Sequence, residues 1–372
     1  MATVIRPYSE DRIAGVREFN RRLQAGGASD YLVFPESPVP VWLPKIDGAR
    51  VYNEYFLALD GEAVRGAYVR KRQECSFAGE VRPVDFYHHA LSEGLVDKAY
   101  ATVGVQLLRH ALKNEPVMYA LGMEGYDRPL PRMLEAMGWS HFLVPFYFRV
   151  VRPVRFLRDM QLLRGDVARR LAMDAAAFTG AGWLAIKTVQ GVRALRAPRQ
   201  RRVGVVEMPG FPDWADRLWE DAKPRYSMTA VRDAASLRTL FPTGNRRFTR
   251  LKISRDGAPI GWAVVAEQNK KPRYGGMRVG CVLDCFARPE DAVPVVRAAA
   301  GALERAGMDL IVSNQSHASW GDAFRRCGFL AGPSNFIFAA SKALAGLLAP
   351  FEEKRPQIHV TRADGDGLYQ YV

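Results

Sequence analysis

A chain of 372 residues, 48% of them hydrophobic and 25% charged, is long enough for two domains with separate cores, and this composition excludes a disordered protein. Lys and Arg residues number 53 against 39 Asp and Glu, a net charge of +14 that favours an anionic partner such as nucleic acid, a membrane surface or a phosphorylated cofactor. The four cysteines form no CxxC pair and the chain starts without an apolar signal core, so we predict no metal site and a cytoplasmic protein with reduced thiols.

The first half of the chain alternates strand and helix patterns. An amphipathic helix is predicted over residues 9–26, and an Asp-Gly turn at Gly61 joins two runs of strand-forming residues, the pattern of a β-hairpin. A second helix follows at 103–114, and a last helix ends at Gly138, before an aromatic residue and a final strand.

A basic segment over residues 151–202 separates the two halves. It contains twelve Arg or Lys and three Asp, and its arginines alternate with Leu, Phe, Met and Trp at helical spacing. Such a segment fits either a peripheral helix on an anionic membrane or a helical bridge docked between the domains. Of these two, we expect the docked bridge.

The second half repeats the units of the first in the same order. A second Asp-Gly hairpin turns at Gly257, 196 residues after Gly61, and a second Gly-aromatic unit lies at Gly328, 190 residues after Gly138. Strands and helices that recur by chance are the alternative, but the conserved order of the units favours a duplication. We therefore predict domains at 1–150 and 203–345, joined by the linker 151–202 and followed by a C-terminal tail, 346–372.

This order of elements, with AMGW and RCGF ending the last helix of each half, resembles the GNAT N-acetyltransferase fold over residues 2–150 and 203–341. The resemblance implies an α/β (α+β) protein with two tandem GNAT-like domains, each a mixed, largely antiparallel sheet flanked by helices. The tandem layout is similar to that of Fem-type aminoacyl transferases and of acyltransferases associated with polysaccharide synthesis.

The family binds the diphosphate of its coenzyme in an Arg/Gln-x-x-Gly-x-Gly/Ala loop before a long helix. In DKAYATVGVQLL, Gly104 matches the last position and a threonine replaces the earlier glycine. The resemblance implies acetyl-CoA or another acyl-CoA, bound by Lys98, Ala99, Thr102, Val103 and Gly104. The second half has no glycine at this place but Glu290 and Asp291, so we expect a degenerate copy without the coenzyme.

An acyl transfer to an amine needs a base for the ammonium proton and an acid near the leaving thiolate. Polar residues cluster in one predicted strand and the loop after it, namely Asp85, His88, His89 and Glu93. The family's usual tyrosine, four residues before the glycine, is Leu134 in one half and Phe324 in the other. Tyr126 is the nearest replacement, so the predicted catalytic residues are Asp85, His88 and Tyr126, with solvated or core roles as the alternative.

The stretch SNQSH and one strand of the second half are candidates for binding the acceptor. The predicted substrate-binding residues are Asp284, Asn314, Gln315 and His317. The alternative for SNQSH is a helix cap at Ser316 or Ser319. Asp284 lies in an apolar strand and must either pair with a basic residue or face a cleft.

Together these patterns predict an N-acyltransferase that moves an acyl group from acyl-CoA to an unknown amine, with an amino sugar or a cell-envelope precursor among the candidates. A non-catalytic binding scaffold with the same fold and an aminoacyl-tRNA-dependent transferase are the alternatives. Nucleic-acid binding is not favoured, because the sequence has no recognisable binding module.

Overall fold

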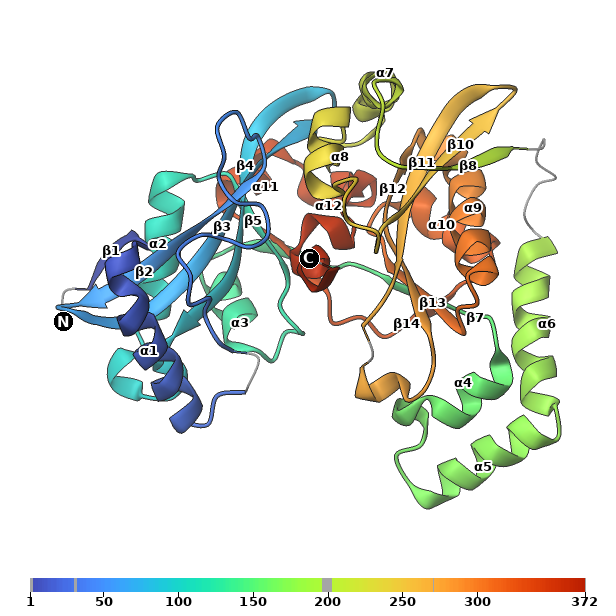
Figure 1. The fold of residues 1–372 in the computed structure, drawn as a ribbon, viewed down its shortest axis with the longest axis horizontal. Helices are drawn as coiled ribbons and strands as arrows, with labels where there is room; N and C mark the ends of the chain where they lie inside the picture. Colours follow the sequence, from blue (N-terminus) through green and yellow to red (C-terminus); the bar gives the residue numbers. More distant parts are fainter. Residues whose placement is uncertain (1–2, 30–31, 196–202, 270, 372) are drawn as a thin grey trace.

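The computed structural model describes residues 3–29, 32–195, 203–269 and 271–371, which form two lobes built around two sheets (Figure 1). The first sheet contains β1 (Val4–Pro7), β2 (Tyr52–Asp60), β3 (Ala63–Phe77), β4 (Glu80–Ser92), β5 (Met118–Gly122), β6 (Ser140–Leu143), β9 (Met228–Ala230), β15 (Ile337–Ala340) and β16 (Ile358–His359). The second sheet contains β7 (Phe146–Val150), β8 (Gly204–Met208), β10 (Thr249–Arg255), β11 (Ala258–Glu267), β12 (Val279–Ala287), β13 (Leu310–Asn314) and β14 (Leu330–Gly332).

Helices cover both sheets. They are α1 (Ile13–Ala25), α2 (Val103–Asn114), α3 (Pro129–Ala136), α4 (Pro153–Asp159), α5 (Val167–Phe178), α6 (Ala181–Leu195), α7 (Trp214–Ala222), α8 (Ala234–Leu240), α9 (Ala292–Arg305), α10 (Ala318–Arg326), α11 (Lys342–Leu347) and α12 (Phe351–Lys354). In the described part of the chain, none of these helices is long and apolar enough to cross a bilayer.

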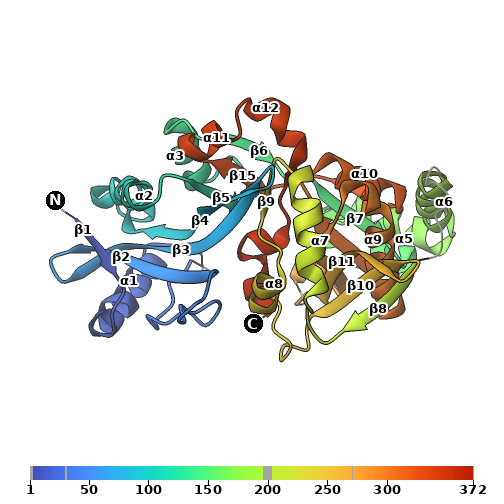
Figure 2. The ribbon, with the colours of Figure 1, turned by 90° about the horizontal axis from the view of Figure 1, so that it is seen from above.

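The two sheets have the same strand order and exchange one strand with each other. The first runs β1-β2-β3-β4-β5-β15-β6, and the second runs β8-β10-β11-β12-β13-β7-β14. Strand β7 follows the first half in sequence but pairs with β13 and β14, whereas β15 lies between β5 and β6 (Figure 2). The equivalent order of strands and helices supports the predicted duplication.

This exchange changes the domain boundaries that the sequence suggests. A cut after residue 150 places β7 in the first domain, although its hydrogen bonds lie in the second sheet. In the same way, the predicted domain 203–345 includes β15, which pairs in the first sheet. Each half therefore completes the sheet of the other, because β15 is inserted between β5 and β6 and β7 between β13 and β14.

Both predicted hairpins form, with turns that need a left-handed backbone. Gly61 has a φ of 59° in the turn between β2 and β3, and Asp256 and Gly257 have φ angles of 50° and 83° in the turn between β10 and β11. Glycine adopts such angles without steric cost, and Asp tolerates them better than most residues do. The Asp-Gly pairs therefore fix where each hairpin turns.

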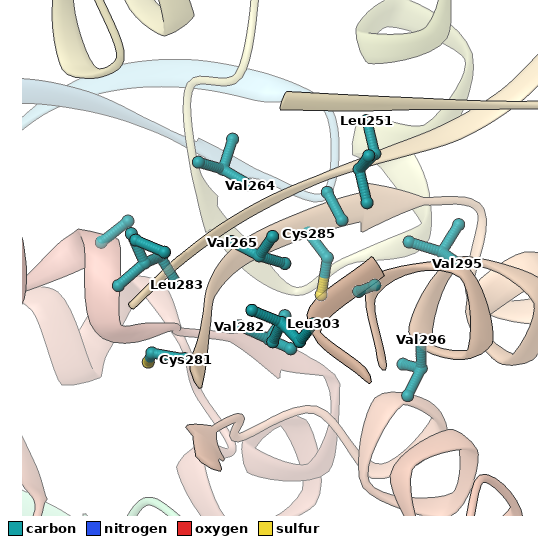
Figure 3. Close-up of a cluster of buried hydrophobic side chains, with 14 of the residues drawn as sticks. Leu251, Val264, Val265, Cys281, Val282, Leu283, Cys285, Val295, Val296 and Leu303 are labelled. Atoms are coloured by element: carbon teal, nitrogen blue, oxygen red, sulfur yellow. The ribbon is translucent and has the colours of Figure 1, made fainter. Parts of the chain in front are cut away.

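The core of the second half lies between β10–β12 and the helices on either face. All nine residues of β12 are buried, and α9 covers one face with Val295, Val296 and Leu303 (Figure 3). A strand covered on both faces is normally apolar throughout. Asp284, in the middle of β12, is therefore the exception that needs a partner.

The linker docks on the second half rather than between the two halves. Helix α4 buries Phe156 and Leu157, and Arg155 lies 3.2 Å from the buried carboxylate of Asp309. Gln190 of α6 donates to the backbone oxygen of Val150. Helices α4–α6 form the outer edge of the second lobe, away from the first (Figure 1). Residues 196–202 of the predicted linker lie outside the described residues.

The C-terminal segment (residues 358–371) does not extend as a tail but runs back between the lobes, where the C-terminus lies (Figure 1). Strand β16 pairs with β9, and β9 pairs with β3 of the first half. Thr361 then forms a bridge with Gln315 of the second half. The segment therefore contacts both sheets within a few residues.

Four charged side chains join the two sheets to this segment; we call Lys71, Arg232, Asp284 and Asp364 the central cluster. Arg232 Nε lies 2.9 Å from Asp284 Oδ2, and its Nη2 lies 2.7 Å from Asp364 Oδ1. Lys71 donates to the backbone oxygen of Asp364. Since all four side chains are buried, each charge depends on its partners in place of water.

We predict that Arg232→Met lowers the free energy of unfolding by about 3–5 kcal/mol, because it leaves two carboxylates buried without their cation. The matched control is Arg288→Met, which removes an exposed ion pair with Asp221 and should cost less than about 1 kcal/mol. Urea unfolding of both variants at pH 7 measures the difference. Equal losses would show that the buried cluster contributes no more than a surface pair.

Candidate functional site

The central strands of the first sheet separate between β4 and β5. Their parallel pairing covers only Asp85 with Met118 and Phe86 with Tyr119, although β4 continues to Ser92. A register shift in the pairing of β3 with β4 marks a bulge in this part, where His89 has a φ of 47°. The strands therefore open a gap beyond Phe86.

A cavity of about 750 Å³ lies at this opening, on the face of the sheet opposite α2. Apolar walls come from the loop after α1, with Phe34 and Trp42, and from Tyr55 on β2. Its polar lining includes His88, His89, Lys271, Arg362 and Asp366, and also Glu36, which is paired with Arg17. A concave site with apolar walls and a few convergent polar groups is typical of a small-molecule site. A second cavity, of about 540 Å³, lies beside α9 and β11.

Asp366 places a carboxylate at the mouth of the opening between the strands. A Cβ atom on Gly122, at the end of β5, would lie 4.0 Å from Asp366 Oδ1. The Asp366 side chain is exposed at the cavity. The protein packed around it raises the pKa of its carboxyl by desolvation, against the opposing charges of Lys71 and Arg362. A carboxylate with a raised pKa is a suitable proton acceptor.

The two histidines of β4 are held in different ways. The His88 ring stacks on Phe86 with the ring centres 4.5 Å apart, and its buried Nε2 has no hydrogen-bond partner among the described residues. His89 Nε2 lies 2.8 Å from the backbone oxygen of Val33, so that nitrogen carries the proton. Burial lowers the pKa of both rings, so both are neutral near pH 7.

Lys71 lies beneath the cavity, next to its wall. Its ammonium group is 5.6 Å from the ring centre of Trp42, which lines the cavity, and it donates to the backbone oxygen of Asp364. Burial lowers the pKa of Lys71 to about 8. The charge of Asp366 also acts on Lys71, so the central cluster and Asp366 belong to one set of interacting charges.

The three predicted catalytic residues do not come together. Asp85 faces α2, on the other side of β4 from the cavity, and lies 3.1 Å from Arg72 and 3.6 Å from Arg70. Burial raises the pKa of Asp85 to about 6, although both arginines oppose this. Tyr126 lies on the loop after β5 and is 3.2 Å from His141. Of the three, His88 alone lines the cavity.

The predicted coenzyme residues do lie together, at the start of α2. Lys98, Ala99 and Thr102 are exposed there, Gly104 is half-buried, and the Val103 side chain packs in the core. Not every backbone N–H of this loop is free, because those of Ala99, Tyr100 and Ala101 donate within the preceding 3-10 turn. The N–H groups of the first turn of α2 remain, since a helix leaves them without partners.

In the second half, acidic residues occupy the equivalent place before α9. Glu290 and Asp291 form the turn that precedes the helix, and Arg255 holds Asp291 at 2.7 Å. The opening between β12 and β13, which are paired only up to Cys281 and Val312, is also occupied. Thr361 enters it and donates to Asp284. The two copies are therefore unequal.

The four predicted acceptor residues are buried around this second opening. Asp284 pairs with Arg232, Gln315 donates to Cys285, and the side chain of His317 caps α10 by accepting from Ser319 N–H. Asn314 accepts from Nε of Arg362, which lines the cavity of the first half. Among the described residues, none of the four lines either cavity.

Sequence patterns did not predict the polar residues that the C-terminal segment brings to the cavity, Arg362 and Asp366, or Lys271 from the second half. The acidic and aromatic run DGDGLYQY contains Asp366 but neither cation, and it does not indicate contact with a strand almost three hundred residues earlier. Long-range placement of this kind depends on the packing of the two halves.

No protein-family model and no curated protein matches the chain. A conserved protein of unknown function from Enterococcus faecalis V583, described as a probable N-acyltransferase, matches with a TM-score of 0.51 and 9% identity over 94% of this chain and 75% of that one. Saccharomyces cerevisiae N-myristoyltransferase with bound myristoyl-CoA and inhibitors matches with a TM-score of 0.50 and 9% identity over 91% of this chain and 79% of that one. These matches confirm the predicted fold class of two tandem GNAT-like domains. The Fem-type likeness stays a prediction.

We predict that His317 makes the protein less stable in acid. Desolvation lowers the pKa of this ring from 6.5 to about 4, so the unfolded chain takes up a proton that the folded chain does not bind. Its contribution is present above pH 6.5 and is lost as the pH falls to 4. His317→Asn keeps a cap but cannot titrate, so it should lose up to about 3 kcal/mol less than the wild type between pH 7 and pH 4 in urea unfolding. Equal losses of unfolding free energy in the variant and the wild type would contradict this role of His317.

Proposed function

We propose that the protein is an N-acyltransferase that transfers an acyl group from acyl-CoA to an amine. The observation that carries this proposal is the cavity at the opening of β4 and β5, with the Asp366 carboxylate at its mouth. The likeness in fold to N-acyltransferase structures supports it.

The donor is assigned to the first half. Its diphosphate would lie at the N–H groups of the first turn of α2, with Lys98 adding positive charge. The acyl-carrying arm would then pass through the gap between β4 and β5 to reach the cavity on the opposite face. In the second half, acidic residues and Thr361 occupy the corresponding places, which favours one donor site in the chain.

The reaction needs one proton acceptor and one oxyanion site. Asp366 takes a proton from the ammonium form of the acceptor, and the free amine attacks the thioester carbonyl. The backbone of the bulged part of β4, which has no strand partner on its β5 side, is the candidate oxyanion site. Collapse of the intermediate breaks the C–S bond, and the second amine proton goes to the leaving sulfur.

The charges of the cavity favour an acceptor that is also anionic. Lys271 and Arg362 line the same cavity as Asp366. Burial lowers the pKa of Lys271, and the charges of Arg362 and Asp366 also act on it, while Arg362 opposes the rise in the pKa of Asp366. An amine at Asp366 and an anionic group near the two cations would satisfy both sets of charges. An amino sugar or a cell-envelope precursor stays a prediction.

We predict that Gly104→Val weakens acyl-CoA binding at least about tenfold, because the added methyl groups cover the N–H groups of α2. The variant should fold, since a Cβ atom there meets only Met133 and Ser92, each at 3.9 Å. Gly346→Val, in α11 with open space around it, is the matched control. Isothermal titration with acetyl-CoA and myristoyl-CoA measures both variants. An unchanged affinity of Gly104→Val for acyl-CoA would show that the donor does not bind at the start of α2.

We predict that Asp366→Asn lowers kcat by about 10²–10⁴-fold while acyl-CoA affinity stays unchanged, because the amide cannot accept the ammonium proton. In the wild type, kcat/KM should rise with pH through the raised pKa of Asp366, and the variant should lose this acidic limb. Asp213→Asn, an exposed residue at the start of α7, is the control. A variant that binds acyl-CoA and reacts like the wild type would rule out Asp366 as the base.

A further inference from the structure

The helical pair α5–α6 exposes an unusual amount of apolar surface. Phe178 is 89% exposed and Leu171 65% on α5, and Leu184 is 61% and Trp183 47% exposed on α6. Phe178, Trp183 and Leu184 flank the short turn between the two helices. This corner projects from the outer edge of the second lobe (Figure 1). Large apolar residues gathered in this way on a surface mark an interaction site.

The exposed residues form the outer face of each helix. On α5, Val167, Leu171 and Phe178 are separated by four and seven residues and share one face, whereas Met173 and Ala177 turn toward the protein. On α6, Gln190 is buried against the second half, whereas Leu184 is exposed. The inner faces of α5 and α6 pack on the second half, which accounts for the position of the two helices. Their outer apolar faces have no partner among the described residues.

The charges around this face are basic. Exposed arginines on α4 and α5 include Arg158, Arg169 and Arg170. Two of the three carboxylates on these segments are already paired, Asp174 with Arg164 at 2.7 Å and Asp166 with Arg169 at 3.2 Å. Helix α6 has no acidic residue, and in the sequence five arginines follow within residues 193–202. Arg158 and Arg170 form no ion pair among the described residues, and an apolar face beside such arginines is complementary to an anionic lipid surface.

We propose that the α5–α6 corner binds the surface of an anionic lipid bilayer, with Phe178, Trp183 and Leu184 inserted among the headgroups. The helices lie on the surface rather than cross it, since no described helix is long and apolar enough to span a bilayer. A second copy of the chain fits this face less well, because each copy has a net charge of +14 and the arginines of the two would face each other. This inference does not depend on the proposed acyl transfer.

The test is flotation of the full chain with vesicles of phosphatidylcholine containing 30% phosphatidylglycerol. We expect binding that weakens as salt rises from 50 to 300 mM and that is absent with pure phosphatidylcholine. Phe178→Ser with Leu184→Ser should reduce binding at least about tenfold. The matched control, Ile46→Ser with Val206→Ser, removes exposed apolar residues elsewhere and should bind as the wild type does.

Bromine-labelled lipids give a second readout of the same corner. They should quench part of the tryptophan fluorescence in the wild type and less of it in Trp183→Phe, because quenching requires contact with the acyl chains. The proposal is overturned if vesicles leave the chain unbound, or if the corner variant and the control bind equally. A dimer without lipid that the corner variant abolishes would also overturn it, since a second copy would then cover this face.

Discussion

The arrangement of the molecule depends on one buried cation, Arg232, which holds a carboxylate of the second sheet and a carboxylate of the C-terminal segment. Burying a charge costs several kcal/mol unless partners replace its water, so the position of Arg232 is tied to Asp284 and Asp364 at the same time. Lys71 extends this constraint to the first sheet through the backbone oxygen of Asp364. Two residues further along, the chain places Asp366 in the cavity. The joint between the sheets therefore also sets the position of the candidate base.

The same segment explains why two copies of one fold differ. It passes both strand openings in turn, with Thr361 at the opening of β12 and β13 and Asp366 at that of β4 and β5. The first of these residues closes its opening with hydrogen bonds, whereas the second leaves a cavity and adds a charge to it. The exchange of β7 and β15 holds the copies in register, because neither sheet is complete without the other half. The opening of one copy is thus closed, and that of the other leads to the candidate site.

Local patterns in the sequence were sufficient to predict the repeated units and their order along the chain. The Asp-Gly turns at Gly61 and Gly257 and the two Gly-aromatic units predicted the repeat, because each depends on a few neighbouring residues. The strand exchange could not be predicted, since β7 and β15 have the same apolar alternation as any central strand. The catalytic residues were misplaced for a related reason. Asp85 and His88 are three residues apart in β4 and so point to opposite faces, and local sequence does not show which face carries the cavity. Asp366 reaches the site only through a cluster whose members come from four distant parts of the chain.

The most direct test of this account is a crystal structure of the full chain with a non-hydrolysable acyl-CoA analogue. The account predicts one bound coenzyme, with its diphosphate at the first turn of α2 and its thioester mimic between β4 and β5, near Asp366. Coenzyme bound at α9 in the second half, or a diphosphate at α2 whose acyl arm runs outside the gap between β4 and β5, would contradict it.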